Sequence, residues 1–305
     1  MGHRKPYRIV SIENPAEVHV HDGQLIVIQD KGTASIPVHD IMTLVVCGPS
    51  IRMSTMAQTM LAQRKVTTLF LGRNHHPAAM LLPTVGCVRQ ARVSQIQVSM
   101  ALDLRDRLWQ AIIAQKISNQ ANALRILGLE GFELLQYCSE QVLPGDTDNR
   151  EGHAAKFYFQ FLQPGFNRRV DDPLNSALNY GYAIARAILA REVVCAGFVP
   201  SIGLHHCSQL NPFNLVDDLM EPIRPSIDLL AAEVAGSSCR LSRKQRASLR
   251  EVGRLAVLMD GQPVCMVRAL RILVRSFWNA VASADASLLK LPVTIPAQLL
   301  DMVEE

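Results

Sequence analysis

The sequence predicts an α+β protein in which a small N-terminal β domain is followed by a larger, all-α catalytic domain. Three observations lead to this prediction. Short segments rich in β-branched residues occupy roughly the first 72 positions. From residue 88 to 127 the chain contains no Pro or Gly, and apolar residues recur every three or four positions. The 305 residues are enough for two domains, each with its own core.

The β domain is expected over residues 1–72. Its candidate strands are 8–12, 17–21, 24–28, 35–38 and 43–47. The turns Asp22-Gly23 and Asp30-Lys31-Gly32 separate two pairs of them and are typical of hairpins. Ser54 is expected to cap a short helix, after which 66–71 returns to a strand. Residues 73–87 are expected to form a linker.

The helical domain is expected over residues 88–305. Its first part, 88–127, predicts one long helix or two abutting helices. Pro222 and Pro225 must kink or shorten one of the later helices, because proline lacks the amide that an α-helix interior requires. These later helices are expected at 131–142, 152–163, 173–196, 214–235, 243–260 and 263–284.

Composition narrows the class of protein but does not identify it. Hydrophobic residues make up 49% of the chain and charged residues 19%, which favours an ordered globular protein over a disordered one. The net charge of +4 says nothing decisive about nucleic acid. No apolar run approaches a membrane span, and the first residues lack the apolar core of a signal peptide. Seven scattered cysteines, none spaced Cys-x-x-Cys, indicate free thiols in a reducing cytoplasm.

A cluster of acids follows two adjacent histidines. Asp217 and Asp218 lie four and three positions before Glu221, so a helix would crowd all three onto roughly one face. Like charges this close repel unless a cation lies between them, and divalent cations prefer carboxylate oxygens and imidazole. An N-terminal helix cap and a solvated acidic turn would explain the same carboxylates equally well.

Three segments together resemble the Cas1 family, the integrases of CRISPR adaptation. The first reads Asn-x-Glu-Gly-x-Ala-Ala-x-x-Tyr-Phe at 149–159. The second reads Asp-Pro-Leu-Asn at 172–175, followed by Leu-Asn-Tyr-Gly-Tyr at 178–182. The third reads Gly-Leu-x-His at 203–206, then Phe-Asn-Leu-x-Asp-Asp-Leu-Met-Glu-Pro-x-Arg-Pro at 213–225. The spacer Asn-Pro-Phe-Asn at 211–214 is most similar to the branch found in type II systems.

The resemblance implies a metal-dependent DNA endonuclease and integrase. In such a reaction the 3′ hydroxyl of a short DNA segment attacks a phosphodiester of the CRISPR array, without an enzyme-linked intermediate. The resemblance implies that Glu151, His206 and Glu221 are the catalytic residues and bind Mg²⁺ or Mn²⁺. It also implies double-stranded DNA as substrate, a homodimer that joins a Cas2 dimer, a two-part fold and the cytoplasm of a prokaryote.

The roles of the neighbouring residues stay open at this stage. We interpret His205 as a neighbour of the site and not as a ligand. Asp218 is a further candidate ligand, since the resemblance favours it over Asp217. Leu215 and Leu219 flank Asp217 on a face that we expect to pack inward.

Basic and aromatic residues are candidates for DNA contacts. Arginines spaced by three and four positions predict a positive stripe on one helix, which would bind backbone phosphates without sequence preference. An ordinary solvated helix face would show the same spacing. A tyrosine could stack on a base, although for Tyr182 core packing is at least as good an interpretation. The candidates are Arg168, Arg169, Tyr180, Arg243, Arg246, Arg250 and Arg254.

Two other functions are compatible with the same residues. A general metal-dependent nuclease acting on branched or repair DNA would use the same acids and histidine. A catalytically idle scaffold of an adaptation complex would have no need of a clustered-acid site, which argues against it.

Overall fold

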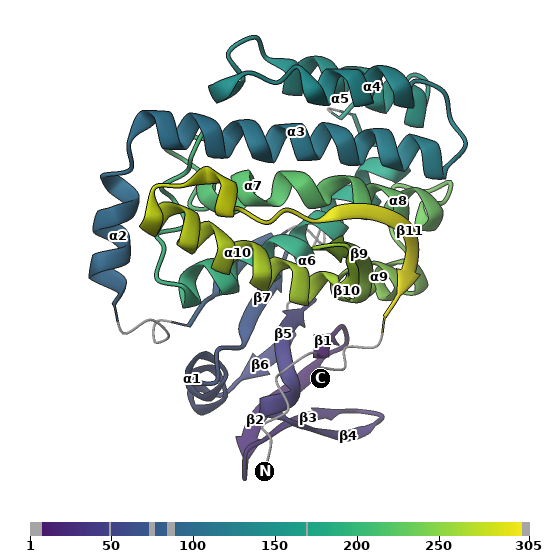
Figure 1. The fold of residues 1–305 in the computed structure, drawn as a ribbon. Helices are drawn as coiled ribbons and strands as arrows, with labels where there is room; N and C mark the ends of the chain where they lie inside the picture. Colours follow the sequence, from purple (N-terminus) through teal and green to yellow (C-terminus); the bar gives the residue numbers. More distant parts are fainter. Residues whose placement is uncertain (1–7, 49, 73–76, 84–88, 169, 301–305) are drawn as a thin grey trace.

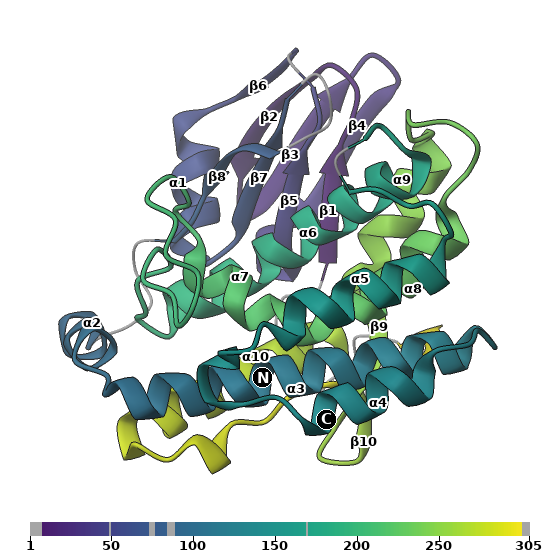
Figure 2. The ribbon, with the colours of Figure 1, turned by 90° about the horizontal axis from the view of Figure 1, so that it is seen from above.

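The computed structural model describes residues 8–48, 50–72, 77–83, 89–168 and 170–300. A β-rich N-terminal part lies beneath a stack of helices in Figure 1, and Figure 2 shows the same arrangement from above. The predicted α+β class is confirmed.

Two four-stranded sheets make up the N-terminal part, in the orders β1-β5-β7-β8 and β4-β3-β2-β6. Asp22 and Gly23 both have positive φ, as a two-residue hairpin between β2 and β3 requires. The Ser54 hydroxyl accepts a hydrogen bond from Ala57 N at 3.2 Å and so caps helix α1 (Thr55–Gln63) as expected. The strands are β1 (Arg8–Ile12), β2 (Ala16–His21), β3 (Gln24–Gln29), β4 (Gly32–Pro37), β5 (Ile41–Val46), β6 (Ile51–Met53), β7 (Thr67–Leu71) and β8 (Pro77–Leu81).

Strand β8 falls inside the range that we expected to be a linker. Its sequence, Pro-Ala-Ala-Met-Leu, has little intrinsic preference for a strand, so antiparallel pairing with β7 makes it one. Residues 73–76 and 84–88 of the expected linker lie outside the described residues.

Helices build most of the remaining chain. The segment 88–127 forms two helices, α2 and α3, and the predicted interruption at Pro222 and Pro225 divides α7 from α8 by a 3₁₀ turn, η3. The helices are α2 (Gln90–Val98), α3 (Leu102–Ile126), α4 (Phe132–Glu140), α5 (Arg150–Leu162), α6 (Pro173–Cys195), α7 (Asn214–Met220), α8 (Arg224–Val234), α9 (Arg243–Arg250) and α10 (Met266–Ser283). The 3₁₀ turn η3 covers Glu221–Ile223.

The C-terminal part is not all-α, because it contains a third sheet in the order β10-β9-β11. The helix expected over 243–260 ends at Arg250, and β9 (Leu255–Met259) follows a 3₁₀ turn, η4 (Glu251–Arg254). Strand β10 is Gln262–Cys265 and β11 is Val293–Leu299. A run of five apolar residues suits a strand as well as a helix, and here pairing with the distant β11 decides for the strand.

Helix α6 passes through the main core, and both of its faces are buried over most of its length. Asn119 of α3 connects two segments that follow it in the chain. Its amide donates to Pro222 O at 2.7 Å and to Pro292 O at 2.8 Å, and its oxygen accepts from Thr294 N at 3.0 Å. These bonds fix η3 and the start of β11 against α3, which places Glu221 under the middle of that helix.

Candidate active site

Glu151 and Glu221 meet at one lysine. Lys116, in the middle of α3, contacts Glu151 Oε1 through its ammonium group and lies 2.5 Å from Glu221 Oε2. The lysine side chain is only 7% exposed. The two acids that the sequence predicts to act together are therefore brought together, and Lys116 is a part of the site that sequence reasoning missed.

Local structure at the start of α5 positions Glu151. The buried Asp146 carboxylate accepts hydrogen bonds from Arg150 N at 2.8 Å and Glu151 N at 3.1 Å. These amides belong to the first turn of the helix, where backbone donors lack helical partners. Asp146 thus caps the helix that carries Glu151, in place of Asn149, whose side chain makes no capping bond.

Glu221 is held by two cations. Its Oε1 accepts from Arg224 Nε at 2.9 Å, one turn further along, and its Oε2 faces Lys116. Burial raises the pKa of a carboxyl group, but Arg224, Lys116 and His206 more than offset this and hold the pKa of Glu221 at about 2. Glu221 is accordingly ionised at neutral pH.

His206 is oriented by Asp218. The imidazole Nδ1 lies 2.6 Å from Asp218 Oδ1, whereas the other ring nitrogen, Nε2, has no hydrogen-bond partner in the part of the chain that the structure describes. The hydrogen bond to Asp218 raises the pKa of His206, and the charges of Asp218 and Glu221 add to this against the opposing effect of burial. A neighbouring carboxylate on one ring nitrogen is the usual support of a metal-binding histidine.

Asp218 itself faces the loop and not an open site. Its side chain has no exposed surface, and its two oxygens accept from the backbone amides of Leu204 at 2.6 Å, His205 at 3.2 Å and His206 at 3.1 Å. With both oxygens engaged in this way, the geometry favours a positioning role of Asp218 behind His206 over the role of a metal ligand that the sequence also allowed. Asp217 points elsewhere, since its Oδ2 accepts from Arg186 Nη2 at 2.6 Å and from Asn211 Nδ2 at 2.7 Å.

His205 packs against an aromatic ring. Its imidazole stacks on the indole of Trp109, with ring centroids 4.4 Å apart and the planes 2° from parallel. This places His205 as a neighbour of His206, on the side of the loop that faces α3.

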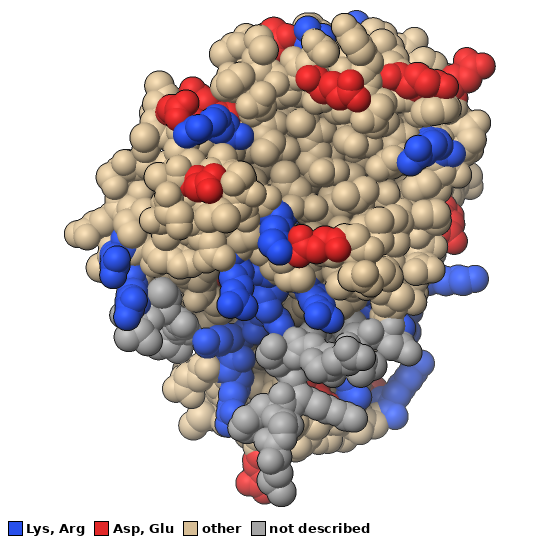
Figure 3. Space-filling view, viewed as in Figure 1, with Lys and Arg blue, Asp and Glu red and all other residues tan. Residues whose placement is uncertain are grey.

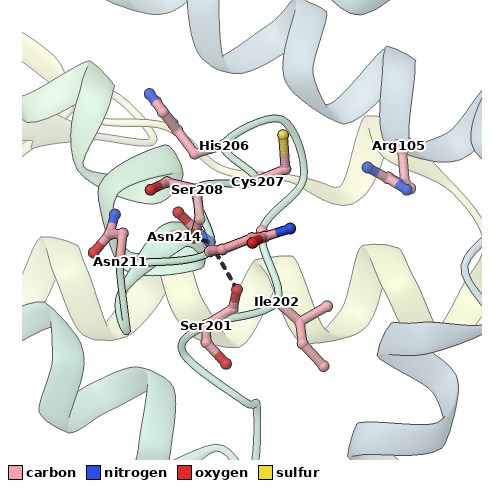
Figure 4. A pocket seen from close by; sticks show the side chains of 10 residues that line it. Arg105, Ser201, Ile202, His206, Cys207, Ser208, Asn211 and Asn214 are labelled. Atoms are coloured by element: carbon pink, nitrogen blue, oxygen red, sulfur yellow. Dashed lines mark hydrogen bonds between the residues drawn. The ribbon is translucent and has the colours of Figure 1, made fainter.

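A cleft of about 400 Å³ lies beside His206. Figure 4 shows its lining, which comes from α3 through Arg105 and from the loop that carries Ser201, Cys207 and Ser208. Asn214 donates from its side-chain amide to Ser201 O and Ser208 O, both at 3.0 Å, and so ties the loop to the start of α7.

The carboxylates of Glu151 and Glu221 and the imidazole of His206 are groups that a hard divalent cation binds, although they do not converge on one point. Glu221 Oε2 is buried and accepts no aligned hydrogen bond from any described residue, in spite of its closeness to Lys116. With Glu151 and the free Nε2 of His206, it offers two carboxylates and one imidazole. Within the described ranges, no three His, Cys, Asp or Glu side chains converge as a finished metal cage.

Most of the arginines predicted to contact DNA form ion pairs within the protein. Arg246 Nη2 lies 3.1 Å and Arg250 Nη1 2.5 Å from the carboxylate of Glu13, and these arginine side chains are 12% and 14% exposed. Arg254 pairs with Glu251 at 2.9 Å, whereas Arg243 is 74% exposed. The four arginines therefore do not form a continuous solvated row, because Glu13 of the N-terminal part pairs with the two central ones, Arg246 and Arg250.

The other residues predicted to contact DNA are Tyr180, Arg168 and Arg169. Tyr180 is buried in the core and does not present its ring to solvent. Arg168 donates to Asn175 Oδ1 at 2.8 Å and Asn179 Oδ1 at 3.0 Å, and its guanidinium lies over the ring of Tyr182. Tyr182 is buried too, with its hydroxyl on Asp228. Arg169 lies outside the described residues.

Two further expectations concern the cysteines and membrane-spanning segments. The six cysteines in the described part are free thiols. No helix among the described residues is long and apolar enough to span a membrane.

Comparison with known proteins points to one family. The family model described as "CRISPR associated protein Cas1" matches residues 9–239. A CRISPR-associated endonuclease Cas1 from Neisseria meningitidis serogroup C (strain 8013) is 32% identical over 295 residues, covering 95% of this chain and 97% of the relative. A CRISPR-associated endonuclease Cas1 from Pyrobaculum aerophilum is 28% identical over 239 residues, covering 71% of this chain and 78% of that relative.

Solved structures share the fold. A casposase bound to its integration product has a TM-score of 0.77 at 17% identity, covering 98% of this chain and 96% of that one. A Cas1 protein from Thermotoga maritima has a TM-score of 0.72 at 14% identity, covering 90% and 97%. A chain of a Cas6-RT-Cas1–Cas2 complex has a TM-score of 0.73 at 16% identity, covering 100% of this chain and 37% of that one.

Proposed function

Because this chain belongs to the Cas1 family, we propose that it is an integrase of CRISPR adaptation that inserts short DNA segments into a CRISPR array. One observation carries the proposal. Glu151 and Glu221, 70 residues apart in sequence, meet at a single cation, and the charge of His206 acts on Glu221. The similarity to the Neisseria meningitidis relative along nearly the whole chain is consistent with the type II branch.

The proposed reaction is the displacement of a phosphodiester oxygen by a 3′ hydroxyl. Such a step needs alignment and neutralisation of charge more than covalent help from the protein. Glu151, Glu221 and Nε2 of His206 would hold Mg²⁺ or Mn²⁺. When bound, the metal would stabilise the negative charge on the phosphate and on the attacking oxygen.

The protein's own residues prepare that site. Asp218 fixes the ring of His206 so that Nε2 is free, and Arg224 fixes one oxygen of Glu221 while leaving the other for a ligand. Asp146 holds the first turn of α5, so that Glu151 faces Glu221 across Lys116. These supports reduce the rearrangement that binding requires.

The substrate is proposed to be double-stranded DNA, from both the captured segment and the repeat array. In Figure 3, Lys and Arg side chains gather on one face where the helical part meets the β-rich part, which suits phosphate contacts. The active protein is proposed to be a homodimer joined to a Cas2 dimer. The association with Cas2 is supported by a structural neighbour named as a Cas6-RT-Cas1–Cas2 complex, and DNA as the substrate is supported by a casposase bound to an integration product. We place the protein in the prokaryotic cytoplasm.

A strand-transfer assay tests the proposal. Purified protein is mixed with a short duplex and a repeat-containing target, with and without Cas2, in Mg²⁺ or Mn²⁺. Glu221→Ala and His206→Ala are expected to abolish transfer while the far-UV circular dichroism is unchanged, and His205→Ala serves as the neighbouring control with a much smaller loss. Full transfer by either variant, or in excess EDTA, would refute the metal site.

The same assay separates the other functions. Cleavage of branched DNA without joining would identify a general nuclease. No reaction on any DNA, together with firm binding to Cas2, would identify a scaffold. Light scattering on the purified protein measures whether it is a homodimer.

A further inference from the structure

We propose that Lys116 is the built-in counter-ion of the metal-free site and competes with the divalent cation for Glu151 and Glu221. On this view, metal binding displaces the ammonium group from between the two carboxylates. The inference deepens the proposed function and rests on it for the identity of the metal.

The first argument is the choice of atoms. The ammonium group of Lys116 contacts Glu151 Oε1 and Glu221 Oε2, whereas Glu221 Oε1 accepts a hydrogen bond from Arg224. Glu221 Oε2 is also the buried oxygen without an aligned hydrogen bond from the described residues. Lys116 therefore lies against the one oxygen of Glu221 that Arg224 leaves open, and a metal bound to that oxygen would have to take the place of the ammonium group.

The second argument is charge. Glu151 and Glu221 bring two negative charges to a largely buried site, and Lys116 and Arg224 bring two positive charges. Among these four groups the charges balance, and Lys116 supplies one of the two positive charges that the facing carboxylates lack when no metal is bound. Adding a divalent cation without moving Lys116 would leave an excess of positive charge in a site where water screens poorly.

The third argument is freedom to move. A lysine carries its charge on a flexible four-carbon stem, and the ammonium group can leave without a change in the helix. Glu151 is 34% exposed, so the site opens toward solvent on the side of α5. Arg224, in contrast, is held by Glu221 and by the ring of Tyr182, whose centroid is 4.8 Å from the guanidinium carbon. We therefore expect Arg224 to keep its position beside Glu221 when a metal binds.

The decisive experiment measures Mn²⁺ affinity in the absence of DNA. Lys116→Met keeps the length of the side chain and removes the competing charge, so we expect Mn²⁺ to bind at least about tenfold more tightly than to the wild type. We also expect the metal-free variant to melt at a lower temperature and to gain more from added Mn²⁺. Lys156→Met is the control, because Lys156 is exposed on α5, and it should leave the affinity unchanged. Unchanged or weaker binding by a folded Lys116→Met protein would overturn the proposal.

A second measurement uses the wild type and does not depend on the folding of the variant. Lysines are acetylated for a short time in EDTA or in saturating Mn²⁺, and the modified positions are quantified by mass spectrometry. Labelling of Lys116 should rise several-fold with Mn²⁺ while that of Lys156 stays constant. Labelling of Lys116 that stays the same or falls would overturn the proposal. Failure of strand transfer by the wild type would instead count against the proposed function, since neither measurement here involves DNA.

Discussion

Oδ1 of Asp218 lies 2.6 Å from Nδ1 of His206, and the same buried carboxylate binds three consecutive backbone amides of the loop that carries the histidine. One side chain therefore sets both the course of the loop and the orientation of the ring. An acid in this place supports the site through the histidine and does not have to touch a metal or DNA.

Asp218→Asn should weaken metal binding with the ligands still present. The amide has only one acceptor oxygen, and its NH₂ group would face backbone donors, so the loop and the ring lose their fixed orientation. We expect Mn²⁺ affinity to fall by about 10- to 100-fold, the usual effect of losing a supporting partner of a ligand. Isothermal titration measures this. Asp217→Asn is the matched control, because Asp217 binds Arg186 and Asn211 and should have little effect. Equal losses from both variants would contradict the positioning role.

Metal affinity should increase with pH above the ordinary pKa of histidine. The pKa of His206 is raised in the folded protein, chiefly by Asp218, and a metal binds only the neutral ring. The stability that the protonated ring contributes has the opposite dependence. It is complete below the unfolded pKa of about 6.5 and is lost as pH rises through the higher folded pKa.

The test compares the wild type with His206→Gln between pH 5.5 and 8.5. Without metal, the difference in unfolding free energy in favour of the wild type should shrink as pH rises. Mn²⁺ affinity of the wild type should rise over the same range. A difference in stability that grows with pH would contradict the raised pKa.

Gly203→Ala should damage the site without touching a ligand. A Cβ at this position would lie 2.4 Å from His206 O and 2.7 Å from Asp218 Oδ2, far closer than real contacts allow. The loop would have to move away from Asp218. We expect a loss of stability of about 1–3 kcal/mol and a large fall in strand transfer. Gly48→Ala is the control, because its nearest neighbour would be at 3.8 Å, and urea unfolding of both variants measures the difference.

Glu13→Gln should loosen the attachment of the N-terminal part to α9. Glu13 pairs with Arg246 and Arg250. Burial by itself would raise the pKa of Glu13, but the two arginines more than offset this, and the pKa is lowered overall. Removing the charge leaves two largely buried guanidinium groups unpaired, and we expect a cost of about 3 kcal/mol in urea unfolding. Arg243→Ala should cost less than about 0.5 kcal/mol, since Arg243 is mostly exposed. A Glu13→Gln protein as stable as the wild type would show that the two arginines are free for another partner.

The fold could be predicted from the sequence where local pattern decides it. The Asp22-Gly23 turn, the Ser54 cap and the break at Pro222 follow from the conformations and hydrogen bonds that those residues allow. Strands β8 and β9 were missed because their own residues suit other structures, and pairing with β7 and β11 makes them strands. Such pairing depends on segments that the local sequence does not contain.

The candidate site shows the same division. The sequence by itself determined the two acids and the histidine of the candidate site, because Glu151, His206 and Glu221 lie in the motifs by which the chain resembles the Cas1 family. Only the tertiary structure decided their partners. Nothing in the sequence around Lys116 distinguishes it from other helical lysines. Arg246 and Arg250 were expected on an exposed stripe that binds DNA or faces solvent, whereas in the fold they pair with Glu13. The physical reason is that charge and burial depend on distance in space, and residues such as Lys116 and Glu221 or Glu13 and Arg250 become neighbours only when the chain folds.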